Sequence, residues 1–282
     1  MQKKVKWVVH DHLIQRALPT GRPNLFQALQ NRGHEVVSLV YGDEDRSLSN
    51  LPDWDGECVV TYGSVQFVNQ VVKLRRGKWQ PGAFLRVENL SYAAYSPFLG
   101  DILLNDDFVI VPYAEFRRRG VKAWGDAVFI RPNAVTKLFT GFVITERDFN
   151  HETNSLERLS NVFPEDLLVI ASPKPILGEF RFIISEGQVV TGSAYSWDNT
   201  LDVRSDVHPA CLELAEEVGR REWQADRVYT CDIALTEISG KQEARVLEIN
   251  AFSCSGLYAC DTGLIADAVS QAAWNEYSGD DI

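Results

Sequence analysis

The sequence is short of cysteine, of positive charge and of long apolar runs. Its five cysteines form no C-x-x-C pair, and no histidine stands close to Cys254 and Cys260. Neither a disulfide framework nor a zinc site is therefore expected, and the scattered thiols are typical of a reduced, cytoplasmic protein. No apolar stretch approaches the roughly 18–20 residues that a membrane helix needs. The first apolar run is interrupted by His10 and Asp11, which argues against a secretory signal.

The formal net charge of −11 argues against a surface that binds nucleic acid nonspecifically, because an acidic surface repels phosphate. The small basic patch RRRG at 117–120 leaves nucleic acid open as an alternative partner. The five histidines are scattered, and no Ser–His–Asp or Cys–His set stands out. Covalent catalysis by a side-chain nucleophile is therefore not indicated.

The beginning of the chain alternates between strand and helix patterns. Apolar stretches at 4–9, 34–40 and 57–64 predict strands, and the patterns at 23–33 and 64–77 predict helices. This alternation indicates a small parallel α/β layer.

The remainder consists of closely spaced strands with short turns, a pattern typical of antiparallel pairing. The strands are expected at 127–132, 138–145, 167–172, 178–185, 188–195, 228–238 and 244–252. Helices are expected at 208–224 and 263–277, and a connection between the two parts at 115–125. We therefore predict an α/β (α+β) protein with one domain at 1–120 and a second at 121–282.

A carboxylate and an amide stand two residues apart in the stretch RVLEINAF. In a strand, Glu248 and Asn250 project from one face, and their oxygens suit a hard cation such as Mg²⁺. If 228–238 and 244–252 form an antiparallel hairpin, Asp232 can lie across from them as a third donor. Concentrated acid of this kind is costly without a bound cation. The alternative is an edge strand whose polar face meets water.

A magnesium–nucleotide site also needs cations for the phosphates. The later strands and their connections carry four candidates, namely Arg131, Lys137, Lys174 and Arg181. In the stretch GEFRF, Glu179 and Arg181 share one face, and two phenylalanines take the other. Each charge alone is compatible with a solvated surface, but their position among apolar residues favours a buried site.

The order FIRP, TKLFTGF, VIASPKPILGEFRFII, VVTGSAY, CDIAL and VLEINAFSCSGLY resembles the ATP-grasp superfamily. More narrowly, it resembles the branch named for two arginines and one lysine, common in phage and bacterial genomes. The resemblance covers about residues 124–265. It implies an N-terminal parallel α/β pre-ATP-grasp domain followed by an antiparallel-sheet nucleotide-binding region. One departure is the phosphate loop, because NAVTKLFTG contains a single glycine, Gly141.

The resemblance also implies a role for each candidate residue. The expected ATP contacts are Arg131, Lys137, the adenine hinge Val169, Ile170 and Ala171, then Lys174, Glu179 and Arg181. Lys137 and Arg181 are the expected catalytic residues, with Arg181 stabilising the transferred phosphate. The expected ligands of Mg²⁺, or of Mn²⁺ in its place, are Asp232, Glu248 and Asn250.

Enzymes of the superfamily that the sequence resembles typically join a carboxylate to an amine or a thiol. ATP phosphorylates the carboxylate, the amine displaces phosphate from the acyl-phosphate, and ADP and phosphate are released. We therefore expect an ATP-dependent ligase acting on small-molecule or peptide substrates. The alternatives are a ligase or modifier of nucleic acid or of a nucleic-acid-linked amino acid, and a non-catalytic nucleotide-binding module.

The acceptor side is less clearly specified. Tyr195 follows a strand that often borders substrate in this superfamily, and Ser253, Ser255 and Tyr258 follow the E-x-N strand. The two serines are equally compatible with a cap between a strand and a helix. His10 ends the first strand, where α/β sheets commonly bind ligands. We expect substrate contacts from this group.

Overall fold

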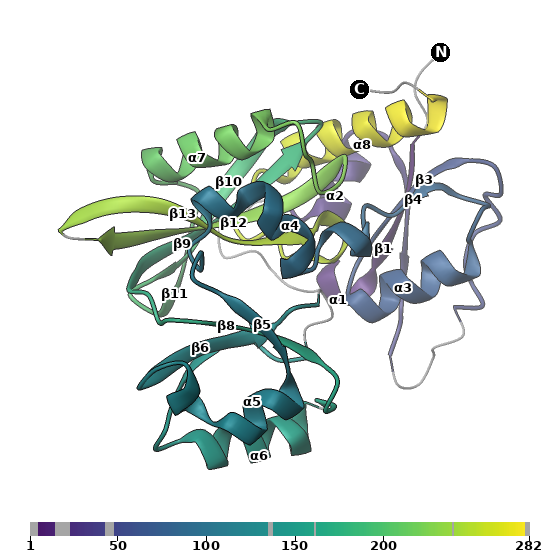
Figure 1. Cartoon of the computed structure of the whole chain (residues 1–282). Coiled ribbons are helices and arrows are strands. Elements are labelled where there is room, and N and C mark those ends of the chain that lie inside the picture. Colours follow the sequence, from purple (N-terminus) through teal and green to yellow (C-terminus); the bar gives the residue numbers. More distant parts are fainter. Residues whose placement is uncertain are drawn as a thin grey trace.

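The computed structural model describes residues 5–14, 23–42, 48–134, 138–160, 162–238 and 240–279. Within these ranges the chain forms one parallel and two antiparallel β-sheets with helices packed against them (Figure 1). The predicted mixed α/β architecture is thereby confirmed. None of the described helices is both long enough and apolar enough to cross a membrane.

The first sheet is parallel and has the strand order β2-β1-β3-β4. Its strands are β1 (Lys6–His10), β2 (Glu35–Leu39), β3 (Cys58–Tyr62) and β4 (Gln80–Gly82). Both of its faces are covered, as is usual for parallel sheets. One face packs against α2 (Leu25–Asn31) and the C-terminal helix α8 (Thr262–Ser278), and the other packs against α3 (Val65–Leu74). The short helix α1 (Asp11–Ile14) follows β1 directly.

Side-chain caps define where these helices begin. Asn24 and Gln27 form a reciprocal capping box at the start of α2. The hydroxyl of Ser64 accepts a hydrogen bond from the backbone N–H of Phe67 at the start of α3, and Asp261 caps α8. Each cap satisfies backbone donors that have no partner within the first helical turn.

The second sheet is antiparallel, with the order β11-β10-β9-β12-β13. Its strands are β9 (Ile176–Ser185), β10 (Gln188–Trp197), β11 (Thr200–Arg204), β12 (Val228–Ile238) and β13 (Lys241–Ala251). One face packs against α4 (Tyr92–Leu99) and α7 (Pro209–Arg220), and Phe180 and Phe182 are buried there. Arg181 lies on the opposite face, as the alternation in GEFRF predicts.

The third sheet is also antiparallel, with the order β5-β8-β6-β7. Its strands are β5 (Val109–Pro112), β6 (Ala127–Pro132), β7 (Phe142–Thr145) and β8 (Leu167–Ala171). Helices α5 (Tyr113–Arg119) and α6 (Phe149–Leu159) share its apolar core and form a separate lobe with it (Figure 1). Short 3-10 turns lie at Val87–Asn89, Gly100–Ile102, Val121–Ala123 and Phe252–Cys254.

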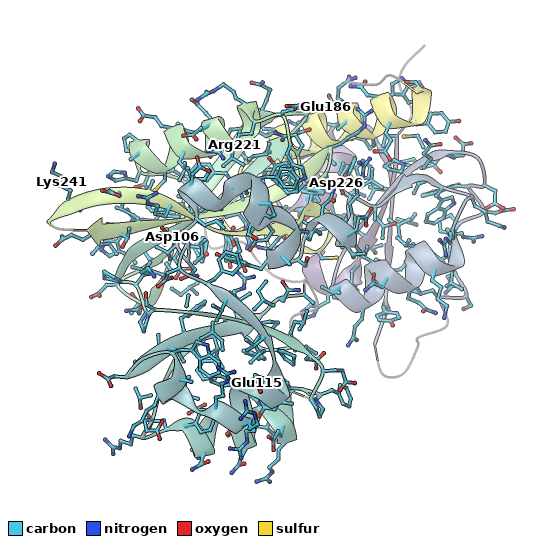
Figure 2. All side chains as sticks on the ribbon, in the orientation of Figure 1. Asp106, Glu115, Glu186, Arg221, Asp226 and Lys241 are labelled. Carbon is cyan, nitrogen blue, oxygen red and sulfur yellow. The ribbon has the colours of Figure 1, made fainter. Side chains whose placement is uncertain are left out.

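The segment expected as a connection between the two parts, 115–125, is largely helical. Its run of charges suggests a solvated linker, but Tyr113 and Phe116 bury one side of α5 in the third core. Glu115 pairs with Arg118 at 2.8 Å and with Arg119, which offsets the basic run (Figure 2). The division near residue 120 remains a prediction.

Helices α4 and α6 and the strands β4, β5 and β11 were not predicted from the sequence. The helices have weak signals, because α4 contains Pro97 and α6 buries few side chains. The strand expected at 138–145 begins at Phe142.

Candidate functional site

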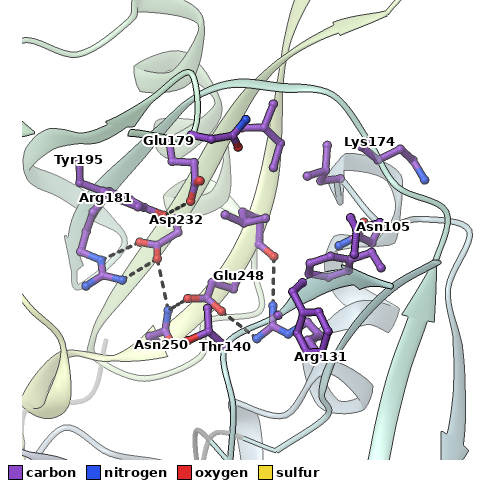
Figure 3. Close-up of a pocket in the computed structure, with 18 of the residues that line it drawn as sticks. Asn105, Arg131, Thr140, Lys174, Glu179, Arg181, Tyr195, Asp232, Glu248 and Asn250 are labelled. Carbon is purple, nitrogen blue, oxygen red and sulfur yellow. Dashed lines mark hydrogen bonds and ion pairs between the residues drawn. The ribbon is translucent and has the colours of Figure 1, made fainter. Parts of the chain in front are cut away.

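A cleft of about 910 Å³ lies between the second and third sheets (Figure 3). Its walls come from β6, β7, the connection between β8 and β9, and the strands β9, β10, β12 and β13. The residues predicted for the site that line it are Arg131, Lys174, Glu179, Arg181, Tyr195, Asp232, Glu248 and Asn250. The structure therefore brings most of the predicted polar set into one cavity.

The β12–β13 hairpin places the acids as expected. Asp232 pairs in register with Glu248, and Thr230 pairs with Asn250. The register shifts immediately after Asp232, so that Leu247 is an additional residue on β13. Such a bulge removes one residue from the regular ladder. The carbonyl of Leu247 accepts a hydrogen bond from Arg131 Nη1 at 3.4 Å, and this contact links the second sheet to the third.

Arg181 and Asp232 form a bidentate ion pair in the interior of the cleft wall. Nε lies 2.7 Å from Oδ1 and Nη2 lies 2.5 Å from Oδ2, and the residues are only 4% and 1% exposed. Burial by itself would lower the pKa of Arg181, but the charge and hydrogen bonds of Asp232 raise it above its ordinary value. The guanidinium therefore stays charged and in a fixed orientation.

Arg131 makes the second ion pair, across the cleft. Its Nη2 lies 2.8 Å from Glu248 Oε2, and its guanidinium carbon lies 5.6 Å from the centre of the Tyr92 ring. Burial opposes the charge, but Tyr95, Glu248 and Tyr92 raise the pKa of Arg131. An arginine from the third sheet is thus held against a carboxylate of the second sheet.

Positive charge therefore compensates both carboxylates, Asp232 and Glu248, which corrects the expectation that they need a bound cation for this. Two arginines neutralise them, and Asn250 Nδ2 donates to Glu248 Oε1 at 2.8 Å and approaches Asp232 Oδ2 at 3.5 Å (Figure 3). Arg181 stands 51 residues from Asp232 in the chain, and Arg131 stands still further from Glu248. No local pattern in the sequence therefore reveals the pairing.

The donor set nevertheless fits a hard divalent cation. Asp232, Glu248 and Asn250 place two carboxylates and an amide against one cavity, and such oxygens are ligands that Mg²⁺ prefers. In the described part of the chain no three His, Cys, Asp or Glu side chains cluster in a metal-binding arrangement, so the third protein oxygen has to come from Asn250. The amide now directs its nitrogen at the carboxylates, and it must turn by half a rotation to present Oδ1.

Two stacked tyrosines form the wall next to Arg181. The rings of Tyr195 and Tyr258 lie 4.6 Å apart with 9° between their planes. The Tyr195 hydroxyl donates to Glu179 Oε2 at 2.7 Å, and the Arg181 guanidinium lies 5.0 Å from the Tyr258 ring centre. Burial, followed by the charges of Asp232 and Glu179, raises the pKa of Tyr195, so that its hydroxyl stays a donor.

Lys174 lies at the opposite side of the cleft and is held by Asp107. Its Nζ lies 2.7 Å from Asp107 Oδ1 and 2.6 Å from Ser172 Oγ. Burial alone would raise the pKa of Asp107, but its hydrogen bonds with Lys174 and Ser172 lower it. The predicted hinge residues Val169 and Ile170 do not line the cleft.

The expected hinge lies inside the third sheet. Val169 and Ile170 are paired in the ladder with β5 on one side and β6 on the other, and Ala171 is paired with Phe129 of β6. The backbone of Val169 and Ile170 therefore has a neighbouring strand on both sides, and that of Ala171 is paired on one side. The segment that lines the cleft begins at Lys174 and continues through Leu177.

Ser253, Ser255 and His10 also lie outside the cleft lining. Ser253 Oγ accepts from the backbone N–H of Phe84 at 3.0 Å, and Ser255 Oγ donates to the carbonyl of Ala251 at 2.6 Å. Both serines stabilise the loop that follows β13. Lys137 lies outside the described residues.

His10 is a buried packing residue in this structure. Its Nε2 lies 3.1 Å from the carbonyl of Tyr41, and its ring stacks on Phe67 at 4.8 Å. Burial lowers the pKa of His10, which favours the neutral imidazole with Nε2 as the donor.

Several cleft residues escaped the sequence reasoning, and Asn105 and Thr140 are two polar ones among them. Asn105 stands in the stretch LLNDDF, where no motif distinguishes it from an ordinary loop amide. Thr140 precedes Gly141 in the loop that approaches Arg131 (Figure 3). Only a fold that brings 103–107 beside the cleft identifies Asn105.

Comparisons with known proteins agree with this geometry. The family model that matches residues 62–270 describes an ATP-grasp domain, in family 3 of the clade named for two arginines and one lysine. No curated protein sequence matches the chain.

Several solved structures are similar in fold. One is the D-cycloserine synthetase DcsG, at 11% identity over 95% of this chain and 99% of that chain, with a TM-score of 0.62. Another is the D-alanine–D-alanine ligase of Bacillus anthracis in complex with ATP, at 11% identity over 99% and 100%, with a TM-score of 0.62. A third is the ATP-grasp ligase PsnB in complex with a minimal precursor, at 16% identity over 96% and 99%, with a TM-score of 0.57.

Proposed function

The chain belongs to the ATP-grasp enzymes, in family 3 of the clade named for two arginines and one lysine, and we propose that it is a carboxylate–amine ligase that consumes ATP. In the proposed reaction a carboxylate is phosphorylated by ATP, an amine attacks the acyl-phosphate, and an amide or peptide bond forms with release of ADP and phosphate. The observation that carries this proposal is the convergence of two arginines, two carboxylates and one amide in a single cleft.

This arrangement supports phosphoryl transfer more than covalent catalysis. Asp232, Glu248 and Asn250 are proposed to hold Mg²⁺ or Mn²⁺, which when bound would neutralise phosphate charge. Arg181 and Arg131 add fixed positive charge on both sides of those ligands. Their pairing with the acids keeps them oriented before nucleotide arrives, which is the kind of preorganisation that electrostatic catalysis requires.

The remaining nucleotide contacts are proposed at the Lys174 side of the cleft. Glu179 is proposed for the ribose and the segment after Val169, Ile170 and Ala171 for adenine. Lys137 is retained as the proposed second catalytic residue and as a cation of the phosphate loop.

The acceptor site is proposed beside Arg181. Tyr195 and Tyr258 provide an aromatic wall, and the Tyr195 hydroxyl is held by its hydrogen bond to Glu179. Neighbours in fold include a D-alanine–D-alanine ligase and a ligase captured with a minimal precursor, so we propose a small-molecule or peptide carboxylate and amine as substrates. Ser253, Ser255 and His10 are proposed to stabilise the backbone near this site rather than to contact the substrate.

A nucleic-acid substrate is the less favoured alternative. The arginines of the RRRG patch are paired, with Arg118 and Arg119 on Glu115 and Arg117 on Glu157 at 3.2 Å. Such pairing reduces the charge available to phosphate. A cytoplasmic location is also proposed, from the scattered cysteines of the sequence.

The deciding experiment is product analysis with pooled carboxylates and amines. Release of ADP and phosphate only when both pools are present supports the ligase. Release of AMP would overturn the acyl-phosphate mechanism, and an absence of turnover with every pool, despite binding of Mg·ATP, would favour a non-catalytic nucleotide-binding module.

A further inference from the structure

A buried side-chain amide, that of Asn105, contributes to the wall of the cleft. Asn105 is 3% exposed and contributes to the cleft lining. Its backbone carbonyl accepts from the Tyr92 hydroxyl at 2.7 Å, but among the described residues its side-chain amide makes no hydrogen bond. A buried amide without partners is unfavourable unless a ligand or water satisfies it.

The backbone around Asn105 is held on both sides. Leu104 donates its N–H to the carbonyl of Val246 at 2.8 Å, which attaches the segment to β13. Two residues further along, Asp107 binds Lys174 and the backbone N–H of Ser172, which attaches it to the connection between β8 and β9. The amide of Asn105 is therefore presented from a rigid wall.

Asn105 lies at the end of the cleft that is proposed for the base of the nucleotide, not at the end proposed for its phosphates. In Figure 3, Asn105 lies on the side of Lys174, away from Asp232 and Asn250. The proposed metal ligands and Arg181 define the phosphate end. Apolar residues of the cleft that can cover the two faces of a planar ring are Leu90, Leu104, Pro132, Pro175 and Ile176.

An amide offers a donor and an acceptor side by side. This pair matches the edge of adenine that carries the 6-amino group and N7, because Oδ1 can accept from the amino group while Nδ2 donates to N7. The same edge of guanine or hypoxanthine carries two acceptors, and one amide cannot satisfy both. We propose that Asn105 binds this edge of adenine and selects ATP over 6-oxopurine nucleotides. The inference rests on the proposed nucleotide-binding function and adds its base specificity.

The test compares four probes, each with Mg²⁺: ATP, ITP, 7-deaza-ATP and tripolyphosphate. Dissociation constants are measured by calorimetry for the wild type, for Asn105→Leu and for Asp106→Ala. Leucine is similar in size to asparagine and removes the unpaired amide, and Asp106 is an exposed neighbour that serves as the control in the same segment. Unfolding of each variant without ligand is measured in parallel.

We expect the wild type to bind ATP about 10- to 100-fold more tightly than ITP or 7-deaza-ATP. Asn105→Leu should remove this preference because it weakens ATP binding, and it should leave tripolyphosphate binding unchanged. The variant should unfold no earlier than the wild type. Asp106→Ala should behave like the wild type.

Retention of the wild-type ratio of ATP to 7-deaza-ATP in Asn105→Leu would overturn the inference. Equal weakening of all four probes together with earlier unfolding would also overturn it, because it would show a structural role. If the wild type binds ATP without preference, only the inference fails. If the wild type binds neither ATP nor tripolyphosphate, the proposed function itself fails.

Discussion

Two arginines neutralise Asp232 and Glu248 in the cleft, and their removal would have different consequences. Asp232 is almost completely buried and depends on Arg181, whereas Glu248 is partly exposed and has Asn250 as a further partner. A buried charge without its partner costs several kcal/mol, and a partly solvated one costs less. We therefore expect substitution of Arg181 to lower the free energy of unfolding strongly. Substitution of Glu248 should mainly affect nucleotide binding.

For the first pair, Arg181→Met should lower the free energy of unfolding by about 3–5 kcal/mol, because it deprives the buried carboxylate of Asp232 of its bidentate arginine partner. Adding Asp232→Asn should recover part of the lost stability. ADP release, expected in the wild type, should be lost in both the single and the double variant. Urea unfolding measures the first effect and a coupled ADP assay the second. A single variant as stable as the wild type would show that the pair is dispensable for folding.

For the second pair, Glu248→Gln should remove the magnesium-dependent part of the stabilisation by ATP. A ligand at 100 times its dissociation constant stabilises a protein by about 2.7 kcal/mol, and this gain should appear in the wild type. Thermal unfolding with and without Mg·ATP is the measurement. Glu243→Gln is the matched control, since Glu243 lies on the same strand and pairs with Arg245 outside the cleft lining. An equal magnesium-dependent shift in both variants would contradict the metal assignment.

Among the elements, the loop that precedes β7 lies close to β6. A Cβ added at Gly141 would lie 2.6 Å from the Phe129 ring and 3.1 Å from Arg131 Cβ. The single glycine of this loop therefore allows a close approach to the strand that carries Arg131. Its role is local contact between strand and loop rather than a glycine-rich cradle.

Gly141→Ala should consequently weaken Mg·ATP binding and lower stability by about 1–3 kcal/mol, the usual cost of overpacking. Gly100→Ala is the control, because nothing lies within 4 Å of a Cβ at Gly100. Calorimetric titration and urea unfolding measure the two effects. If both alanine variants bind nucleotide like the wild type, the loop adjusts without cost.

For the whole molecule, the first and second sheets are joined by a buried carboxylate. Asp226 stands just before β12 and accepts a hydrogen bond from the backbone N–H of Arg86 at 3.1 Å, beyond β4 (Figure 2). Glu276 of α8 lies 4.0 Å from the same arginine. Burial raises the pKa of Asp226 from 3.8 to about 6, although Arg86 opposes the shift.

The sign of the resulting pH dependence follows from proton binding. Between pH 3.8 and about 6 the folded protein holds a proton on Asp226 that the unfolded chain has released. The contribution of Asp226 to stability is therefore present at low pH and declines by up to about 3 kcal/mol as pH rises through this window. Asp226→Asn should remove this decline. Urea unfolding from about pH 4 to pH 7 tests it, and identical pH profiles for wild type and variant would refute it.

Much of the fold could be predicted from the sequence because its signals are local. Alternation in GEFRF placed Arg181 opposite the phenylalanines, and the two runs around Asp232 and Glu248 predicted a hairpin whose register the structure confirms. The period of a strand and the residues of a turn act over a few positions, so they can be read in order along the chain. Helix α6 was missed because its few apolar residues give little signal.

The sequence alone predicts most of the strands, a hairpin with Asp232 across from Glu248, and which polar side chains share a face, since these depend on neighbouring residues. Tertiary packing is what brings Arg131 to Glu248, lays α8 over the first sheet and places Asn105 at the cleft. These contacts join segments that lie far apart in the chain. The polar contacts form where the second and third sheets, each with its own apolar core, meet at the cleft, whereas α8 shares an apolar core with the first sheet.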